Sequence, residues 1–390
     1  MALAKNVPAV RFEGFSGAWV EKQLSDVCEE FQSGKYIKAE YINSTGTYPV
    51  FGGNGLRGYT NLTYNYDGTY ALIGRQGALC GNMSLSIGKA YFTEHAIAVK
   101  SNEFADTVFL YYLFALMKLG QYSGQSAQPG LAVNKLKALN AFFATAKEQT
   151  LIGSYFQTLD TLIAKHQHKH YKLLKMKKAL LEKMFPKQGA SVPEVRFKGF
   201  SGEWEVRTIF SICAETHGGG TPSTSIPEYW NGNIPWIQSS DLQDENVVNA
   251  KARKLISKKA INNSAAKLIP KDSIAIVSRV GVGKVALMEY AYSTSQDFLS
   301  LSKLNINALY GVYVIWRMLQ REKNFVQGTS IKGITNSELL AKTITIPLDD
   351  MEQTHIGTFF QTIDTLITQH QTQIKKLSNL KQACLAAMFV

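Results

Sequence analysis

The sequence has few cysteines, no long apolar run and little charge. Its 390 residues include four cysteines, and none of them forms a Cys-x-x-Cys pair, which argues against a zinc knuckle or a disulfide framework. No stretch of about 18 apolar residues occurs, so we predict no membrane span and no membrane partner. The first dozen residues lack the apolar stretch of a signal peptide, and we therefore expect a reduced, cytoplasmic protein.

The charge is low in amount and unbalanced in sign. Charged residues make up 18% of the chain, below the ~25% that is typical of soluble domains. The 42 basic residues exceed the 30 acidic ones and give a net charge of +12. This surplus favours a polyanionic partner, nucleic acid before an anionic membrane, over a merely basic soluble protein. A hydrophobic content of 45% is sufficient for packed cores, and the length suggests more than one domain.

An internal repeat organises the chain. Residues 7–19 read VPAVRFEGFSGAW and residues 192–204 read VPEVRFKGFSGEW, an offset of 185. Residues 148–167 read EQTLIGSYFQTLDTLIAKHQ and residues 352–371 read EQTHIGTFFQTIDTLITQHQ, an offset of 204. One unit is therefore written twice, and the two offsets differ by 19 residues.

The extra residues of the second copy can be placed within limits. ALIGRQG at 71–77 and AIVSRVG at 275–281 already align at the offset of 204. The insertion therefore lies between Trp204 and Ala275. We expect it in the stretch 216–235, which is rich in Gly, Pro and Asn.

Each copy closes with a segment that has a seven-residue apolar period. The first series is Ile152, Leu159, His166, Leu173 and Leu180, and the second is Ile356, Ile363, His370, Leu377 and Cys384. No Pro or Gly interrupts 154–185 or 358–389, and a sustained heptad of this kind predicts a coiled-coil helix. About 36 residues would make a helix of about 54 Å. Such a helix cannot bury its seam alone, so we expect the two copies to pair antiparallel, as an internal pseudo-twofold repeat.

Polar residues in these helices leave alternatives open. His166 and His370 occupy equivalent seam positions, where they either form a polar layer that fixes register or simply pack against neighbours. Lysines beside the cluster 166–170 disfavour a metal site. The first helix also carries a run of lysines that would face phosphates, solvent or a protein partner: Lys165, Lys169, Lys172, Lys175, Lys177, Lys178 and Lys183.

The two bodies share an order of elements with little identity, which predicts two small α+β domains. Each has a strand ending in an Arg-x-Gly turn, an apolar helix, a Gly-rich loop, a short helix and a strand that leads into the long helix. In the first copy these turn, helix, loop, helix and strand segments are 75–77, 106–119, 124–130, 134–138 and 140–144, and in the second they are 279–281, 308–323, 328–333, 337–342 and 343–347. A shared frame with divergent content is typical of a duplicated scaffold that carries two binding specificities.

The sequence resembles the DNA specificity subunit of type I restriction–modification systems. The segments that carry the resemblance are PVFGGNGLRGYTN (49–61), GGGTPSTSIPEYWNGNIPWIQSSDL (218–242), GTSIKGIT (328–335), the opening WVEKQLSDVC (19–28) and the two closing helices. The resemblance covers essentially the whole chain. It implies target recognition domains at 1–146 and 191–350 and conserved spacer helices at 147–190 and 351–390.

The resemblance also implies a division of labour. Each recognition domain reads one half of a bipartite, asymmetric site in double-stranded DNA. The helices set the spacer and dock two adenine methyltransferase subunits, and motor-nuclease subunits join them in the restriction complex. The chain itself is then non-catalytic and binds no cofactor, while its partners use S-adenosylmethionine, ATP and Mg.

The sequence lacks the motifs of a methyltransferase or nucleotide-binding site, as expected for a subunit whose partners carry out the catalysis. The chain has no [ND]-P-P-[YF] segment to hold a flipped adenine and no G-x-x-x-x-G-K-[ST] phosphate loop. The nearest match, GVGK at 281–284, is interpreted as a turn between strands. A self-contained DNA-modifying enzyme and a coiled-coil protein adaptor are the alternatives that we weigh against a DNA-reading subunit.

Candidate DNA contacts follow from side-chain chemistry, since Arg, Lys, Asn, Gln, Ser and Thr on turns can reach base edges and phosphates. Arg75 and Arg279 come first because they occupy matched turns, although an arginine there could instead tie the turn to a carboxylate. Gln76, next to Arg75, is a further candidate. The Gly-rich loops, which could alternatively cap a helix, and two further turns supply the remaining candidates: Gln125, Gln128, Thr329, Ser330, Lys332, Arg57, Tyr59, Gln238, Ser239 and Ser240. We predict no metal site and no catalytic residue.

Overall fold

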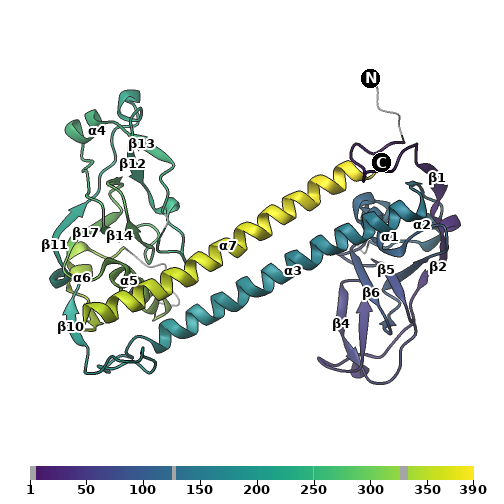
Figure 1. Ribbon diagram of the computed structural model, residues 1–390, viewed down its shortest axis with the longest axis horizontal. Coiled ribbons are helices and arrows are strands. Elements are labelled where there is room, and N and C mark those ends of the chain that lie inside the picture. Colours follow the sequence, from purple (N-terminus) through teal and green to yellow (C-terminus); the bar gives the residue numbers. More distant parts are fainter. Residues whose placement is uncertain (1–5, 125–128, 249, 326–332) are drawn as a thin grey trace. The chain divides into compact units, whose positions relative to one another are not determined.

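The computed structural model describes residues 6–124, 129–248, 250–325 and 333–390. The chain divides into two compact units (Figure 1). Unit 1 comprises residues 1–167 and 372–390, and unit 2 comprises residues 168–371. The division passes through both long helices, α3 (Ala146–Lys183) and α7 (Asp350–Met388), whereas the segments predicted from the sequence keep each helix whole. No helix in the described ranges is long and apolar enough to cross a membrane.

Unit 1 is built on a four-stranded antiparallel sheet in the order β2-β8-β5-β6. A three-stranded sheet, β4-β3-β7, and a two-stranded sheet, β1-β9, accompany it. Its strands and helices are β1 (Val20–Gln23), β2 (Cys28–Ser33), β3 (Tyr48–Gly52), β4 (Gly55–Thr60), β5 (Thr69–Gly74), β6 (Met83–Ile87), β7 (Tyr91–Phe92), β8 (Ala96–Ser101), α1 (Thr107–Met117), α2 (Val133–Lys137) and β9 (Asn140–Phe143).

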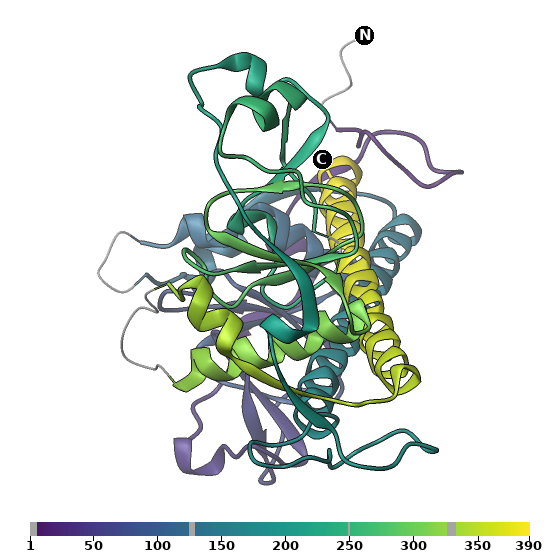
Figure 2. The ribbon, with the colours of Figure 1, turned by 90° about the vertical axis from the view of Figure 1, so that its left-hand side faces the viewer.

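Unit 2 repeats this topology, with sheets β11-β17-β14-β15, β13-β12-β16 and β10-β18. Helix α5 packs on β14 and β15 of the four-stranded sheet, as seen with this unit toward the viewer in Figure 2. Its elements are β10 (Glu205–Thr208), β11 (Cys213–Gly218), β12 (Ile234–Ile237), β13 (Lys254–Ile256), α4 (Lys258–Asn263), β14 (Ser273–Val277), β15 (Val285–Met288), β16 (Ser293–Thr294), β17 (Phe298–Leu304), α5 (Ala308–Phe325), α6 (Asn336–Ala341) and β18 (Thr343–Ile346). The predicted α+β repeat is confirmed.

The predicted place of the insertion in unit 2 is wrong. Strands β2 and β11 begin at an offset of 185, and β3 and β12 still begin at an offset of 186. The offset reaches 204 only at β5 and β14. The extra residues therefore follow β12, in segment 238–272, rather than lying in 216–235. Glycines in the earlier stretch serve close packing instead, because a Cβ at Gly219 would lie 1.9 Å from the Ser295 carbonyl oxygen.

Each core is completed by the last residues of a long helix. In unit 1, Phe389 stacks on Phe109 with ring centroids 5.1 Å apart, and Trp19 of the opening motif meets both rings edge-on. In unit 2, Phe185 stacks on Tyr310 at 5.7 Å, beside Trp204. The first copy's helix thus ends in the core of unit 2, and the second copy's helix ends in the core of unit 1.

The repeated arginine of the opening motif fastens that segment to a long helix. Arg11 donates to both carboxylate oxygens of Glu148, at 2.8 and 2.7 Å. Arg196 makes the same paired contact with Glu352, at 2.6 and 2.7 Å. Both carboxylates are almost fully buried, so each needs its guanidinium partner.

Within each unit the two long helices run antiparallel, as predicted. In unit 1, Tyr155 contacts Cys384 and Asp160 contacts Lys381, so residue numbers rise along one helix and fall along the other. Unit 2 pairs Lys177 with Asp364. The polar layer of His166 and His370 stays a prediction, with simple packing against neighbours as its alternative.

The lysine run of the first long helix is not one exposed face. Lys177 is almost fully buried and paired with Asp364, so it does not belong to a surface stripe. The other members of the run are exposed: Lys165, Lys169, Lys172, Lys175, Lys178 and Lys183.

Candidate nucleic-acid interface

In unit 1, polar side chains from three separate segments line an open cavity of about 380 Å³. Arg57 comes from β4, Gln76 follows β5, and His95 precedes β8. Asn54, in the turn between β3 and β4, lies beside them. The backbones pack closely, because a Cβ at Gly53 would lie 3.1 Å from the His95 carbonyl oxygen and 3.5 Å from that of Gln76.

The Arg-x-Gly turn of unit 1 is held by its own backbone. Arg75 donates its N–H to the His95 carbonyl at 2.9 Å, and its carbonyl accepts from Leu131 at 2.9 Å. Gly77 donates to the Pro129 carbonyl at 3.0 Å and has a φ of 83°, a conformation that glycine adopts without strain. The described end of the Gly-rich loop therefore lies against the turn.

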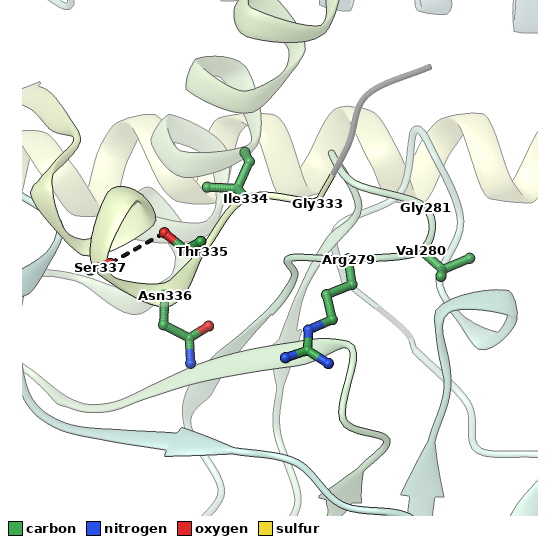
Figure 3. Close-up of a pocket in the computed structure, with 8 residues that line it drawn as sticks. All are labelled: Arg279, Val280, Gly281, Gly333, Ile334, Thr335, Asn336 and Ser337. Atoms are coloured by element: carbon green, nitrogen blue, oxygen red, sulfur yellow. Dashed lines mark hydrogen bonds between the residues drawn. The ribbon is translucent and has the colours of Figure 1, made fainter. Parts of the chain in front are cut away.

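Unit 2 has a larger open cavity, of about 780 Å³, next to its own Arg-x-Gly turn. The turn contributes residues 279–281, and residues 333–337 at the start of α6 form the other wall. Arg279 and Asn336 extend in the same direction in the close-up of Figure 3. Thr335 caps α6 by accepting from the Glu338 N–H, and its hydroxyl lies 3.2 Å from that of Ser337 (Figure 3).

The close packing of this wall parallels that of unit 1. Ile334 donates to the Ser278 carbonyl at 2.7 Å. A Cβ at Gly333 would lie 3.0 Å from that same carbonyl oxygen. In both copies the end of the Gly-rich loop is thus pinned to the turn that carries the arginine.

The three candidate arginines are free of local carboxylates. Among the described residues, no Asp or Glu forms an ion pair with Arg57, Arg75 or Arg279. Arg57 and Arg279 are exposed, and Arg75 is half-buried. An exposed guanidinium that forms no ion pair with the described residues is suited, through its five donors, to phosphate oxygens or to a guanine edge.

Cys80 lies beside the Arg75 turn and donates its thiol to the Arg75 carbonyl at 3.3 Å. Burial raises the pKa of this thiol, which keeps it protonated at neutral pH. Because the thiolate is the nucleophilic form, Cys80 is suited to support the turn and not to react.

The structure brings some of the candidate DNA-contact residues together and places others elsewhere. Arg57 and Gln76 share the cavity of unit 1, and a Cβ at Gly281 beside Arg279 would lie 3.6 Å from Ser239. Ser240 is engaged through its carbonyl by Arg253 at 2.7 Å. Other candidates lie outside the two sets of lining residues or outside the described ranges altogether. The half-buried Tyr59 and Gln238 do not line either cavity, and Gln125, Gln128, Thr329, Ser330 and Lys332 fall outside the described residues.

Sequence reasoning missed the polar lining side chains Asn54, His95, Thr335, Asn336 and Ser337. Asn54 lies in the GGNG turn and Asn336 directly follows the capping Thr335, so local motifs could have indicated both. His95 carries no such signal. Only the antiparallel pairing of β5 with β8 brings it to Gln76.

The GVGK segment is a turn between β14 and β15, as interpreted from the sequence. Gly281 and Gly283 have φ values of 90° and 101°. Lys284 donates to the carbonyls of Ser239 and Leu242, at 3.3 and 2.9 Å. This lysine therefore joins the segment after β12 to the turn. In the part of the chain that the structure describes, no group of three His, Cys, Asp or Glu side chains is placed to hold a metal ion.

A family model for the type I restriction modification DNA specificity domain matches residues 17–176 and residues 201–379. The chain belongs to this family. The two matches correspond to the two copies of the repeat, so each copy is one specificity domain.

Curated relatives of the specificity family match parts of the chain. The type I restriction enzyme EcoprrI specificity subunit of Escherichia coli is 39% identical over 145 residues, 36% of this chain and 36% of the relative. The MjaIX specificity subunit of Methanocaldococcus jannaschii is 30% identical over 182 residues, 46% of this chain and 42% of the relative. These matches span less than half the length of each relative.

A solved structure matches the specificity fold along the whole chain. The crystal structure of a type I restriction–modification system S subunit from M. genitalium superposes with a TM-score of 0.74 and 14% identity, covering 98% of this chain and 99% of that one. At this identity the likeness shows the fold alone.

Proposed function

We propose that this chain is the sequence-reading subunit of a type I restriction–modification complex, in which each unit reads one half of a bipartite site in double-stranded DNA. The arginine-bearing turns and the described ends of the neighbouring Gly-rich loops form the reading surface. In unit 1 these are Arg57 and Gln76 with the turn at Arg75, and in unit 2 Arg279 with Ser239.

One observation carries the proposal. The two units have the same strand order and place a cavity beside the same Arg-x-Gly turn, yet the side chains around the two cavities differ. Unit 1 lines its cavity with Asn54, Gln76 and His95, whereas unit 2 uses Asn336 and Ser337. A repeat that served only as a scaffold would have no reason to differ at these positions, but two readers of different half-sites would.

The long helices supply the surface for partners. We infer that they set the spacer between half-sites and dock two adenine methyltransferase subunits, with motor-nuclease subunits joining in the restriction complex. Large apolar side chains exposed on both helices support a docking role: Leu151, Leu162, Tyr171, Met176, Met351, Leu366 and Leu380. Exposed lysines of the first helix add charge to that surface.

The chemistry then belongs to the partners. We propose that this chain neither catalyses a reaction nor holds a cofactor, and that S-adenosylmethionine, ATP and Mg are used by the methyltransferase and motor-nuclease subunits. The absence of a flipped-adenine motif and of a phosphate loop in the sequence supports this division.

The test uses the full chain copurified with its modification subunits. A library of duplexes with randomised bases is incubated with S-adenosylmethionine, and the methylated adenines are mapped by sequencing. We expect one motif in which two short specified parts flank an unspecified spacer. A single continuous motif, or methylation without sequence preference, would contradict the proposal.

Two controls separate the alternatives. The chain incubated alone with S-adenosylmethionine should transfer no methyl group, and transfer would instead favour a self-contained enzyme. Binding of the complex to DNA should weaken steeply with salt, because phosphate contacts release counterions. DNA binding that is absent at every salt concentration would favour a protein adaptor.

A further inference from the structure

The polar group around the cavity of unit 1 contains a hydrogen-bond relay. His95 Nδ1 lies 3.1 Å from Gln76 Oε1, and His95 Nε2 lies 3.2 Å from Glu94 Oε1. Gln76 is exposed at the cavity, and the His95 side chain is 44% exposed, so both can reach a ligand. The other carboxylate oxygen of Glu94 is buried with no hydrogen-bond partner among the described residues.

The carboxylate fixes one end of this relay. An ionised carboxylate only accepts hydrogen bonds, so the 3.2 Å contact with Glu94 favours a hydrogen on His95 Nε2. The Nδ1 atom is then the variable one. It donates when the imidazole is charged, and it accepts when the imidazole is neutral.

The state of Nδ1 decides which end of the Gln76 amide faces outward. A donating Nδ1 holds the amide oxygen and leaves the amide NH2 toward the cavity. An accepting Nδ1 holds the NH2 group instead and leaves the oxygen toward the cavity. The two orientations differ by a half turn of a terminal amide, a torsion with two nearly equivalent settings.

We propose that Gln76 contacts a base edge in one half-site, and that His95, held by Glu94, sets whether Gln76 offers a donor or an acceptor to that base. The proposal rests on the proposed function and deepens it. An outward NH2 suits the acceptor atoms of guanine or the O4 of thymine, whereas an outward oxygen suits the exocyclic amine of adenine or cytosine. His95 is a positioning residue in this account, and Gln76 is the reader.

Two groups of opposite charge face His95. Glu94 contacts its ring, and Arg57 lines the same cavity from β4. Tyr91 on β7 lies near Glu94, and burial, with a further contribution from Glu94, raises the pKa of its hydroxyl, so it stays neutral. Histidine is the side chain that ordinarily changes charge between about pH 5 and 8.

The described residues of unit 2 form no such relay. The pairing of Ile73 with Ile97 in unit 1 corresponds to that of Val277 with Phe298 in unit 2. Counting from these pairs places Val280 at the position of Gln76 and Gln296 at that of His95. Valine cannot donate or accept, and Gln296 Oε1 accepts from Thr221. The proposal therefore concerns one half-site only.

The experiment maps base preference at two pH values. The full chain, copurified with its modification subunits, methylates a library of randomised duplexes at about pH 6 and about pH 8. At one position of one half-site we expect the ratio of guanine and thymine to adenine and cytosine to fall about tenfold from the lower to the higher pH. Ratios at the other positions should hold, because a change in methyltransferase rate affects all sequences equally.

Three variants test the roles of Gln76 and His95 separately. Gln76→Glu places an acceptor at the cavity permanently, so adenine or cytosine should be preferred at both pH values. His95→Asn removes the imidazole and should abolish the pH dependence at that position. His217→Asn is the matched control, because His217 in unit 2 also lies beside a carboxylate, Glu215, and bonds to Ser302 at 2.8 Å. It should leave the pH dependence intact.

The outcomes are separable. A bipartite motif whose base ratios do not change with pH, or a pH dependence that survives in His95→Asn, would overturn the relay and leave the proposed function standing. Loss of a bipartite motif in the unaltered complex would overturn the proposed function, and the relay with it.

Discussion

Lys177, near the end of the first long helix, reaches Asp364 of the second across 2.6 Å, and both side chains are almost completely buried. Asp364 also accepts from the Tyr313 hydroxyl at 2.7 Å. Unit 1 repeats the arrangement in more exposed form, with Lys381 and Tyr112 both bound to Asp160. A residue from each copy therefore completes the polar contact of the other.

Because the Lys177–Asp364 pair is buried and the Lys381–Asp160 pair is partly exposed, neutralising the aspartate should destabilise unit 2 more than unit 1. Asp364→Asn leaves the Lys177 ammonium buried without a counter-charge, and we expect it to lower the free energy of unfolding by about 3 to 5 kcal/mol. Asp160→Asn is the matched control, and because Asp160 and Lys381 are partly exposed its cost should stay below about 1 kcal/mol. Denaturant unfolding followed by hydrogen exchange in α5 and α1 measures both. Equal losses would contradict the burial argument.

Because the second long helix ends in the core of unit 1, a substitution at the C-terminal end of the chain should destabilise the N-terminal unit. Phe389→Ala removes a ring packed on Phe109 and should cost about 3 to 5 kcal/mol. Hydrogen-exchange protection should fall in α1 and hold in α5. Val390→Ala, at a position that is 39% exposed, is the control and should change little. Unchanged protection of α1 in Phe389→Ala would show that this ring is not part of the unit 1 core.

Buried Tyr292 predicts a pH dependence of stability at the alkaline end. Burial raises the pKa of its hydroxyl to about 12, despite hydrogen bonds with Ser273 and Ser300 that act in the opposite direction. The unfolded tyrosine loses its proton first, at about pH 10. The stability contributed by the raised pKa is therefore complete below about pH 10 and is lost as the pH rises toward 12.

Tyr292→Phe removes this contribution. The fall in the free energy of unfolding between about pH 10 and pH 12 should become shallower by about 2 to 3 kcal/mol in the variant. Urea unfolding across that pH range tests it. Parallel curves for the variant and the unaltered chain would be inconsistent with a buried, protonated hydroxyl.

The spacer proposal predicts the effect of helix length. Seven residues inserted both between Gln167 and His168 and between Gln371 and Thr372 preserve the contacts within each unit, because both insertions lie at the boundary between units. They add about 10 Å of helix, which corresponds to about three base pairs of DNA. The methylated motif should keep its two specified parts and gain about three base pairs between them.

An insertion in the first helix alone is the contrasting variant. It moves Lys177 away from Asp364 or Asp160 away from Lys381, so it should destabilise the chain and not lengthen the spacer. An unchanged spacer in the doubly extended chain would reject the idea that the helices measure it.

Much of the fold could be predicted because the sequence patterns that specify it are local and occur in both copies of the repeat. The apolar period of the closing segments predicts the long helices, and the repeated Arg-x-Gly turns mark equivalent positions in two sheets. The position of the insertion could not be predicted, since Gly and Pro in segment 216–235 indicate tight packing as well as loops. Lys177 also looked like one of several surface lysines, because its buried partner lies 187 residues away in the sequence.

The candidate site was predicted in part for the same reason. Gln76 and Arg279 stand in turns that the sequence marks with glycine, whereas Arg57, which was also expected in a turn, lies on strand β4. His95 could not be found, because its role depends on strand pairing and on a side-chain contact with Gln76. Polar relays of this kind have no sequence period, so only the three-dimensional arrangement reveals them.

The central claim is that each unit reads its own half-site, and mapping methylated adenines with one arginine removed at a time tests it most directly. Complexes carrying Arg57→Ala or Arg279→Ala are compared with the unaltered complex on the randomised library. We predict that the first variant relaxes base preference in one half of the motif and the second in the other half. In each case the free-energy difference between the preferred base and the other bases should fall by about 1 to 3 kcal/mol. Relaxation of both halves by either variant, or of the same half by both, would contradict the account.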